Sequence, residues 1–456
     1  MKPKFIAKLD PQFNPMSIAY RNFVEEAKKK GGQKLVIGIE RNKGYVSTFT
    51  TTVFPDGVKD AENIEMVERI IKALLWFRGG YKIIIAGSKV IFNAIKDAYA
   101  KDGARAFDNE FMSGVYEREF EVEWRAIEDA PEDKEGAAPV GRHLDGCRIG
   151  FDAGGSDRKV SAVINGESVY SEEVVWFPKI NSDPQYQYDG ILSAMKSAAE
   201  HMPRVDAIGV SSAGVYIDNR IMVASLFLKV SKEDFEKRVK NMYIDIAKEF
   251  GDIPLEVAND GDVTALAGAM SLNDNAVLGI AMGTSEAAGY VDRAGNITGW
   301  LNEFAFAPVD FCKGAMVDEW SGDYGCGVKY FSQDAVIKLA PAAGIELDEN
   351  LSPAEKLKVV QGLMEENDPR AAAIYDTIGV YFGYAIAYYS IFYDIKHVLI
   401  MGRVTSGKGG EIILDKATKV IAEEFPELAE KCELHIPDEK SRRVGQSVAA
   451  ASLPKI

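Results

Sequence analysis

The chain has 456 residues, with 53 basic and 69 acidic side chains and a formal net charge of −16. This length exceeds one compact core and predicts about two to four domains. The acidity argues against broad binding to nucleic acid or to anionic membranes, because both need a basic surface. We therefore expect neither a nucleic-acid partner nor a membrane partner, although the net charge does not exclude a local basic patch.

The cysteines and the apolar segments indicate a cytoplasmic protein. No two cysteines form a CxxC pair, so neither a zinc ribbon nor a redox motif is indicated, and free thiols are expected. The first residues lack the apolar core of a signal peptide. The most apolar stretch, residues 378–393, is shorter than the about 20 residues that span a bilayer and predicts a buried helix.

A segment rich in Pro, Gly, Ala and charge, residues 128–146, has no apolar period and predicts an interdomain linker. It separates an N-terminal α+β domain, residues 1–127, from a longer part in which strands alternate with helices. Such alternation is typical of α/β layers. We place a first lobe at residues 147–270 and a second lobe at residues 271–456, whose last helix could return to the first lobe.

The N-terminal part leaves open an internal repeat. When the Ile-Gly pairs of residues 35–54 and 148–170 are aligned, Glu40 falls opposite Asp152, and a helix and a strand ending in Ala-Gly follow in both segments. The first segment lacks the glycines after the acid. It is either a degenerate half-lobe or, as is more common, an unrelated α+β domain.

The most informative segment is GFDAGGSDRK, residues 150–159. Glycines allow positive φ angles and close approach to a ligand, and successive N–H groups in such a turn form an anion-binding nest. Asp152 would then act on a phosphate through a Mg²⁺ ion or its water shell. Taken alone, however, this pattern is more often an ordinary β-turn.

A second acid, Asp260, follows Asn259 at the expected end of a strand, just before a helix. Ligands of α/β sheets bind at the carboxyl ends of strands. Asn259 could orient a substrate hydroxyl, and Asp260 could take its proton as the oxygen attacks phosphorus. The alternative is an ordinary helix start, with Asp260 or Asp262 as the N-cap.

Two further glycine-containing turns follow apolar strands. The Thr284 hydroxyl, next to Gly283, could hold a γ-phosphate. The backbone of residues 402–410 could face an adenosine, and the N-terminus of the following helix suits anions. Each turn is a weak signal alone, but the order of the four motifs fits two lobes that close on a nucleotide.

In this order the motifs resemble the bacterial ROK family (repressors, open reading frames, kinases) within the hexokinase, Hsp70 and actin-like ATPase superfamily. The resemblance covers about residues 147–453. It implies a two-lobed α/β fold of the ribonuclease H-like type, ATP and Mg²⁺ as cofactors, and a homodimer. It also implies that Asp152 holds the metal–phosphate group and that Asp260 is the catalytic base. The implied nucleotide- and phosphate-binding residues are Gly154, Gly155, Ser156, Lys159, Gly283, Thr284, Gly402 and Arg403.

The acceptor site departs from the family pattern. The family has a Glu followed three residues later by a His at the sugar, whereas this chain keeps Glu303 and has Phe306 in place of the His. The family's cysteine-rich zinc segment is reduced here to Cys326, and one cysteine cannot make a tetrahedral zinc site. We therefore expect no structural zinc, and Asn259 and Glu303 remain the expected contacts to substrate hydroxyls. The four histidines lie outside the motifs and are assigned no chemistry.

These observations favour an ATP-dependent phosphotransferase that acts on a hydroxyl of a small sugar or polyol. The altered second turn and acceptor site leave open a non-catalytic sugar- or nucleotide-binding regulatory protein with the same fold. A DNA-binding repressor is disfavoured, because the N-terminal region shows no convincing recognition helix and the chain is acidic. A more distant resemblance to ATPase activators of acyl-CoA dehydratases lacks the paired cysteines that bind their iron–sulfur cluster.

Overall fold

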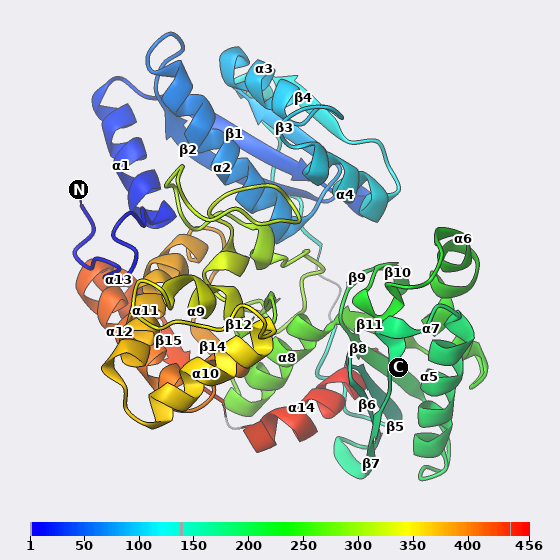
Figure 1. Ribbon diagram of the computed structural model, residues 1–456. Coiled ribbons are helices and arrows are strands. Elements are labelled where there is room, and N and C mark those ends of the chain that lie inside the picture. The colour runs from blue at the N-terminus through cyan, green and yellow to red at the C-terminus, as the bar shows by residue number, and fades with distance from the viewer. Residues whose placement is uncertain (1, 137–139, 438) are drawn as a thin grey trace.

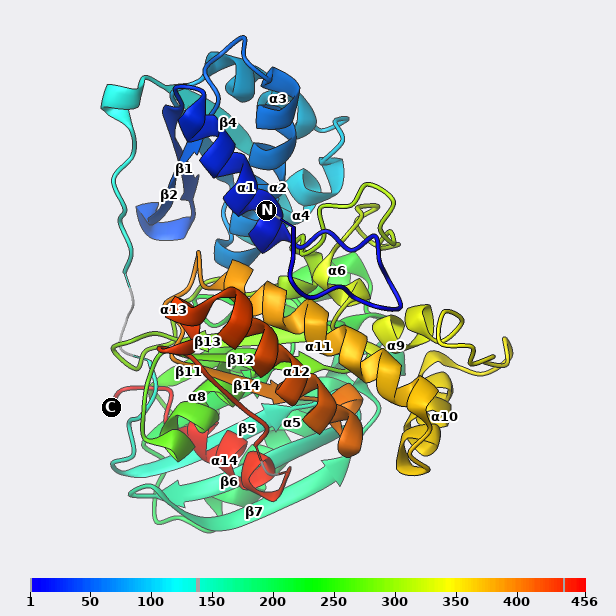
Figure 2. The ribbon, with the colours of Figure 1, turned by 90° about the vertical axis from the view of Figure 1, so that its left-hand side faces the viewer.

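The computed structural model describes residues 2–136, 140–437 and 439–456, except for the side chains of residues 439–444. Figure 1 shows an N-terminal unit above two lobes, and Figure 2 shows the same arrangement from the side. No helix in this part of the chain is both long enough and apolar enough to cross a membrane.

The N-terminal unit is a four-stranded sheet in the order β2-β1-β3-β4, covered by helices. Strand β1 runs antiparallel to both β2 and β3, and β3 runs parallel to β4. Its elements are α1 (Met16–Lys29), β1 (Gln33–Glu40), β2 (Val46–Val53), α2 (Asp60–Arg78), β3 (Lys82–Ala86), α3 (Lys89–Ala98), α4 (Ala106–Tyr116) and β4 (Glu121–Arg125).

The first lobe is a five-stranded sheet in the order β11-β8-β5-β6-β7. Strands β5, β6 and β7 form an antiparallel meander, while β8 and β11 join β5 in parallel. The carboxyl ends of β5, β8 and β11 therefore meet at one edge of the sheet. The elements are β5 (Cys147–Ala153), β6 (Asp157–Ile164), β7 (Glu167–Val175), α5 (Pro184–Ala199), β8 (Ala207–Ser212), β9 (Val215–Ile217), β10 (Arg220–Val223), α6 (Lys232–Asp234), α7 (Met242–Lys248) and β11 (Leu255–Asn259).

The N-terminal sheet and the first-lobe sheet differ in strand direction. Strand β3 is antiparallel to β1, with Ile85 opposite Ile37, whereas β8 is parallel to β5, with Val210 opposite Phe151. The internal repeat would align β1 with β5 and β3 with β8. However, β3 runs antiparallel to β1, whereas β8 runs parallel to β5. The repeat interpretation is therefore wrong, and the N-terminal unit is an α+β unit of different topology.

The second lobe is a four-stranded sheet in the order β13-β12-β14-β15. Strand β12 is antiparallel to β13 and parallel to β14, which in turn is parallel to β15. The elements are β12 (Val277–Met282), β13 (Glu286–Val291), α9 (Gln333–Leu339), α10 (Pro353–Glu365), α11 (Pro369–Tyr389), β14 (His397–Met401), α12 (Lys408–Glu424), α13 (Pro426–Ala429) and β15 (Glu433–His435).

Two helices, α8 (Asp260–Leu272) and α14 (Glu439–Ala451), lie between the lobes (Figure 1). The sequence pattern assigns α8 to the first lobe, but it packs on β12 and β13 of the second. Helix α14 returns to the first lobe and packs on β5 and β8. Buried apolar residues of α8, α14, β12 and β14 form one small core there, which includes Leu266, Leu399 and Ala450.

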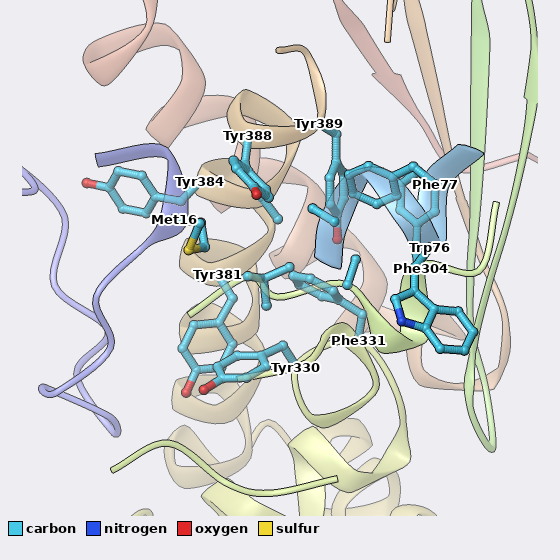
Figure 3. Close-up of a cluster of buried hydrophobic side chains, with 14 of the residues drawn as sticks. Met16, Trp76, Phe77, Phe304, Tyr330, Phe331, Tyr381, Tyr384, Tyr388 and Tyr389 are labelled. Carbon is cyan, nitrogen blue, oxygen red and sulfur yellow. The ribbon is translucent and has the colours of Figure 1, made fainter. Parts of the chain in front are cut away.

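The N-terminal unit shares a continuous core with the second lobe (Figure 3). Trp76 and Phe77, at the end of α2, pack against aromatic rings of the second lobe. The ring centroids of Trp76 and Phe306 lie 4.3 Å apart, and those of Phe77 and Phe304 lie 4.6 Å apart. Because buried aromatic pairs stabilise an interface beyond the area that they bury, we expect the N-terminal unit and the second lobe to move as one body.

A pair of glycines allows α14 to approach the first-lobe sheet. Gly150 of β5 and Gly209 of β8 lie opposite each other in the parallel register. A Cβ atom at Gly209 would overlap the backbone carbonyl of Ala450, and one at Gly150 would overlap that of Ser447.

We expect Gly209→Ala to lower the free energy of unfolding by about 1–3 kcal/mol, because the added methyl group must displace helix backbone rather than a flexible side chain. Urea denaturation measures this loss. Gly114→Ala is the matched control, since Gly114 lies inside α4 with open space around its Cβ position, and helix propensity favours alanine there. Equal stabilities of the two variants would contradict the prediction.

Candidate functional site

The carboxylate of Asp152 lies near the carboxyl end of β5, beside Ser211 of the parallel strand β8. The Ser211 hydroxyl donates a hydrogen bond of 2.8 Å to Asp152 Oδ1, and Gln446 Nε2 of α14 lies 3.4 Å from the same oxygen. Asp152 is 8% exposed, and burial raises its pKa to about 6. The charge of Asp260 contributes to this rise in pKa, so the two predicted catalytic acids interact electrostatically.

Asp260 is the first residue of α8, directly after β11. Asn259 caps this helix: its Oδ1 accepts a 2.8 Å hydrogen bond from the Gly261 N–H, and its Nδ2 donates one of 2.8 Å to the Gly214 carbonyl. The alternative in which Asp260 or Asp262 is the N-cap is therefore wrong. Burial raises the pKa of Asp260, while the Gly261 N–H and the Lys179 charge lower it.

A contact between two glycines positions the start of α8. Gly261 of α8 lies against Gly289 of β13, and a Cβ atom on either residue would overlap the backbone of the other element. The glycine at 289, in the predicted second phosphate segment, therefore serves helix–strand packing. This packing joins Asp260, at the end of a first-lobe strand, to the second-lobe sheet.

The first phosphate turn joins β5 to β6. Glycines are expected in this turn because they allow positive φ angles, but neither Gly154 nor Gly155 has a positive φ. Instead, a Cβ at Gly155 would lie 2.6 Å from Lys179 Cε, and one at Gly154 would lie 2.6 Å from the Asp157 carbonyl oxygen. The glycines thus permit close approach of neighbouring groups to the turn.

Lys179 is a basic residue of this region that sequence patterns did not reveal. It is an exposed residue of the 3₁₀ turn that follows β7, outside every motif. Its ammonium group lies beside Gly155 and is near enough to Asp260 to lower the pKa of that carboxyl. Two other predicted residues are close by: Lys159 lies opposite Asp152 across β5 and β6, and the exposed hydroxyl of Ser156 follows the glycines.

The second and third turns meet at the carboxyl ends of the parallel strands β12 and β14. Arg403 Nη2 donates a 2.6 Å hydrogen bond to Thr284 Oγ1. Gly402 has a φ of 98°, and any side chain there would overlap the backbone of Met282. Around Gly283 the Cβ position is open, with its nearest neighbour, the Ser285 carbonyl oxygen, at 3.7 Å. The structure therefore brings together Gly283, Thr284, Gly402 and Arg403, which the sequence motifs assign to phosphate and nucleotide binding.

The N-terminal unit positions Glu303, a predicted contact to substrate hydroxyls. Residues 301–303 donate their backbone N–H groups to the last carbonyls of α2: Asn302 N to Phe77 O at 3.0 Å, and Glu303 N to Trp76 O at 3.0 Å. These helix-end carbonyls have no partner inside the helix. Burial raises the pKa of Glu303 to about 7, and the charges of Asp260 and Asp262 add to the effect.

Asp262 connects this segment to α8. Its Oδ1 accepts hydrogen bonds of 2.9 Å from Asn302 Nδ2 and 3.0 Å from the Tyr290 N–H. The Tyr393 hydroxyl donates a 2.9 Å hydrogen bond to Asn302 Oδ1. The sequence indicates Asp262 only as a possible helix cap, because its hydrogen-bond partners lie far from it in the chain and no local pattern identifies them.

A cavity of about 200 Å³ lies where the three units meet, and we call it the interdomain pocket. The predicted substrate residue Asn259 lines it, whereas Glu303 does not. The N-terminal unit closes one side and is tied to the first lobe by ion pairs of Glu117 with Arg220 of β10 (2.8 Å) and with Lys240 (2.7 Å). Further lining residues are Arg41, Lys43, Tyr45, Tyr116, Asp218, Glu256, Asp262 and Trp300.

The segment that resembles the family's zinc segment packs on the N-terminal unit. Asp323 Oδ2 lies 2.6 Å from Arg69 Nη2 and 3.4 Å from Lys72 Nζ, and its Oδ1 lies 2.9 Å from Arg105 Nη1. Burial alone would raise the pKa of Asp323, but these three cations hold it well below its usual range. Phe306, at the position of the family's His, likewise packs on Trp76 of this unit.

No protein-family model matches the sequence, and the search of curated proteins gives no match either. Among solved structures, the ROK hexokinase from Thermus thermophilus is similar, with a TM-score of 0.52 at 16% identity over 67% of this chain and 97% of that chain. A ROK family transcriptional regulator, a homologue of the E. coli MLC protein, has a TM-score of 0.50 at 17% identity over 68% and 79%. These likenesses confirm the predicted two-lobed, actin-like ATPase fold.

Breaking the Asp323 cluster tests the docking of the N-terminal unit. Asp323→Asn should lower the free energy of unfolding by about 3–5 kcal/mol, because it leaves buried cations without a countercharge. Urea denaturation gives the value. Asp394→Asn, which breaks an exposed pair with Arg293, is the control and should cost at most about 1 kcal/mol. Similar losses in both variants would contradict a special role for the cluster.

The raised pKa of Asp152 predicts a pH-dependent cost to stability. Below about pH 4 this carboxyl is protonated in both the folded and the unfolded chain. Between about pH 4 and pH 6 the unfolded chain loses the proton first, so the free energy of unfolding falls by about 2–3 kcal/mol.

Asp152→Asn removes this component. The variant should therefore exceed the wild type in stability by about 2–3 kcal/mol at pH 8, but not at pH 4. Denaturation of both proteins at the two pH values measures the difference. An equal difference at both values would refute the prediction, and Asp252→Asn, at an exposed position, should show little effect at either.

Proposed function

We propose that the chain is a member of the ROK family and transfers the γ-phosphoryl group of ATP to a hydroxyl of a small sugar or polyol. The observation that carries this proposal is the placement of Asp152, near the carboxyl end of β5, and Asp260, directly after β11, at the same edge of the first-lobe sheet. A buried pair of like charges raises the pKa of one member, which is common at functional sites. The second lobe supplies the joined turns of Thr284 and Arg403.

In the proposed reaction, Asp260 is the general base. The acceptor hydroxyl would lose its proton to the Asp260 carboxylate as its oxygen bonds to the γ-phosphorus of ATP. The bond from that phosphorus to the bridging oxygen would break, and ADP would leave. The raised pKa of Asp260 suits this role, because a base accepts a proton more readily as its pKa approaches the working pH. Lys179 and Arg403 would offset the charge of the phosphates.

Asp152 fits the role of a Mg²⁺ ligand, either directly or through water. Among the described residues, the hydrogen bonds to this carboxylate end on Oδ1, so Oδ2 is available to the ion or its hydration shell. Oxygen ligands of this kind are those that Mg²⁺ prefers, usually with several waters retained. When bound, the ion would neutralise phosphate charge and fix the position of the γ-phosphate.

The interdomain pocket is the proposed acceptor site. It adjoins Asn259, the residue before the base, and it combines aromatic surfaces with polar groups, a combination that suits a ligand with apolar faces and many hydroxyls. Lys43 and Tyr45 come from the N-terminal unit, so this unit would help to select the acceptor.

A regulatory protein that binds a sugar without chemistry is the second candidate. The likeness to a ROK transcriptional regulator favours it, because that protein has the same fold at a similar TM-score. The replacement of the family's His by Phe306 points the same way. Ligand binding without consumption of ATP would support this function in place of the enzyme.

Asp260→Asn separates the two functions. If Asp260 is the base, the variant should lose about 10²–10⁴-fold in kcat while binding of the ATP analogue with Mg²⁺ stays within a few-fold of wild type. Phosphorylation is measured over a panel of sugars and polyols, and nucleotide binding by isothermal titration.

Asp348→Asn, at an exposed position far along the second lobe, is the matched control and should retain full activity. A wild-type protein that binds sugar but phosphorylates no member of the panel would refute the enzyme. Full activity of Asp260→Asn would refute the assigned base.

A further inference from the structure

Two histidines that are far apart in the chain meet at the edge of the second-lobe sheet. His397 begins β14, and His435 ends β15. In the parallel register His397 lies opposite Glu433, and His435 lies two residues beyond Glu433, so all three side chains project from the same face. His397 Nδ1 lies 3.0 Å from His435 Nε2, and Glu433 Oε2 lies 3.8 Å from the same His435 nitrogen.

A carboxylate orients the buried ring of His397. Its Nε2 lies 3.0 Å from Asp274 Oδ2, just beyond the end of α8. Asp274 also forms an ion pair with Lys396. With the proton held on Nε2 by Asp274, the lone pair of His397 lies on Nδ1 and points toward His435. Metal-binding histidines are commonly held in this way by a carboxylate on their second nitrogen.

We propose that His397, His435 and Glu433 bind one divalent transition-metal ion, with Zn²⁺ the expected ion. Imidazole nitrogens with one carboxylate form a donor set that zinc accepts, and a water molecule can complete a tetrahedron. The site is separate from the proposed phosphoryl-transfer residues.

The distances suit this donor set. Two nitrogens that each lie about 2.0–2.1 Å from a tetrahedral zinc ion are about 3.3 Å apart, close to the 3.0 Å between the two rings. The three ligand atoms all lie within 4.8 Å of one another. Glu433 is exposed, so a small rotation of its side chain can bring the carboxylate closer.

The position of the site links it to the segments between the lobes. His397 projects from the same face of β14 as Leu399 and Met401, which pack in the small core with α8 and α14. Asp274 follows α8, and His435 precedes α14 by four residues. An ion at this site would tie the end of β15 to β14 and, through Asp274, to the end of α8. It would thus place a structural metal where the sequence predicts none.

The test is isothermal titration of the full-length protein, stripped of metal, with Zn²⁺ alone. The wild type should bind one ion per chain, and the double variant His397→Ala/His435→Ala should lose this binding. Asp274→Asn should weaken it about 10- to 100-fold, as expected for a residue that orients a ligand. His201→Ala is the control, because His201 stacks on Tyr170 in the first lobe and should leave the titration unchanged.

Glu433→Gln tests the site without the risk that the double variant fails to fold, because Glu433 is exposed and contributes little to the core. It should weaken Zn²⁺ binding while the circular dichroism spectrum stays that of the wild type. Titration with Co²⁺, whose visible absorption reports tetrahedral nitrogen and oxygen ligands, gives an independent readout. Absence of stoichiometric binding in the wild type, or unchanged affinity in both the double variant and Glu433→Gln, would overturn the proposal and leave a simple imidazole–imidazole hydrogen bond.

Discussion

The last turn of α2 carries the constraint on which the position of Glu303 depends. A helix ends with carbonyl groups that have no partner inside the helix, and in α2 these groups accept hydrogen bonds from residues 301–303. The rings of Trp76 and Phe77, whose backbone carbonyls accept two of these bonds, are fully buried against Phe306 and Phe304. The segment that carries Glu303 is therefore part of two units at once, and its position cannot change without disturbing both.

The N-terminal unit docks on the segments in which the sequence differs from the ROK pattern that it resembles. Phe306, where the ROK pattern has a His, packs on Trp76. The segment that resembles the ROK zinc segment is held by the ion pairs of Asp323. Both changes occur at the surface that the N-terminal unit covers. A buried cluster in which one carboxylate contacts three cations can fix a loop as a metal would. The N-terminal unit thus provides support at the places where the ROK pattern is missing.

The carboxylates of the predicted site and of the Asp323 cluster have pKa values shifted in opposite directions. In the predicted catalytic region, burial raises the pKa values of Asp152, Asp260 and Glu303, because no described cation is paired closely with them. At Asp323, close cations lower the pKa instead. The raised pKa values of the first group lower the stability of the folded protein at neutral pH, which is common where function needs a reactive group. The second group contributes to the cohesion of the fold.

Sequence patterns by themselves determined the alternating α/β order, the turn at Asp152, the Asn259-Asp260 pair at the end of a strand, and the glycine turns at Gly283 and Gly402. Each depends on residues close together in the chain, where strand period and turn chemistry act locally. Only the tertiary structure decided which lobe α8 packs on and in which direction β3 runs relative to β1. It also decided that Lys179 lies beside the first turn and that His397 contacts His435. Those outcomes depend on contacts between segments tens to hundreds of residues apart, and a local pattern carries no information about which distant surface will cover it.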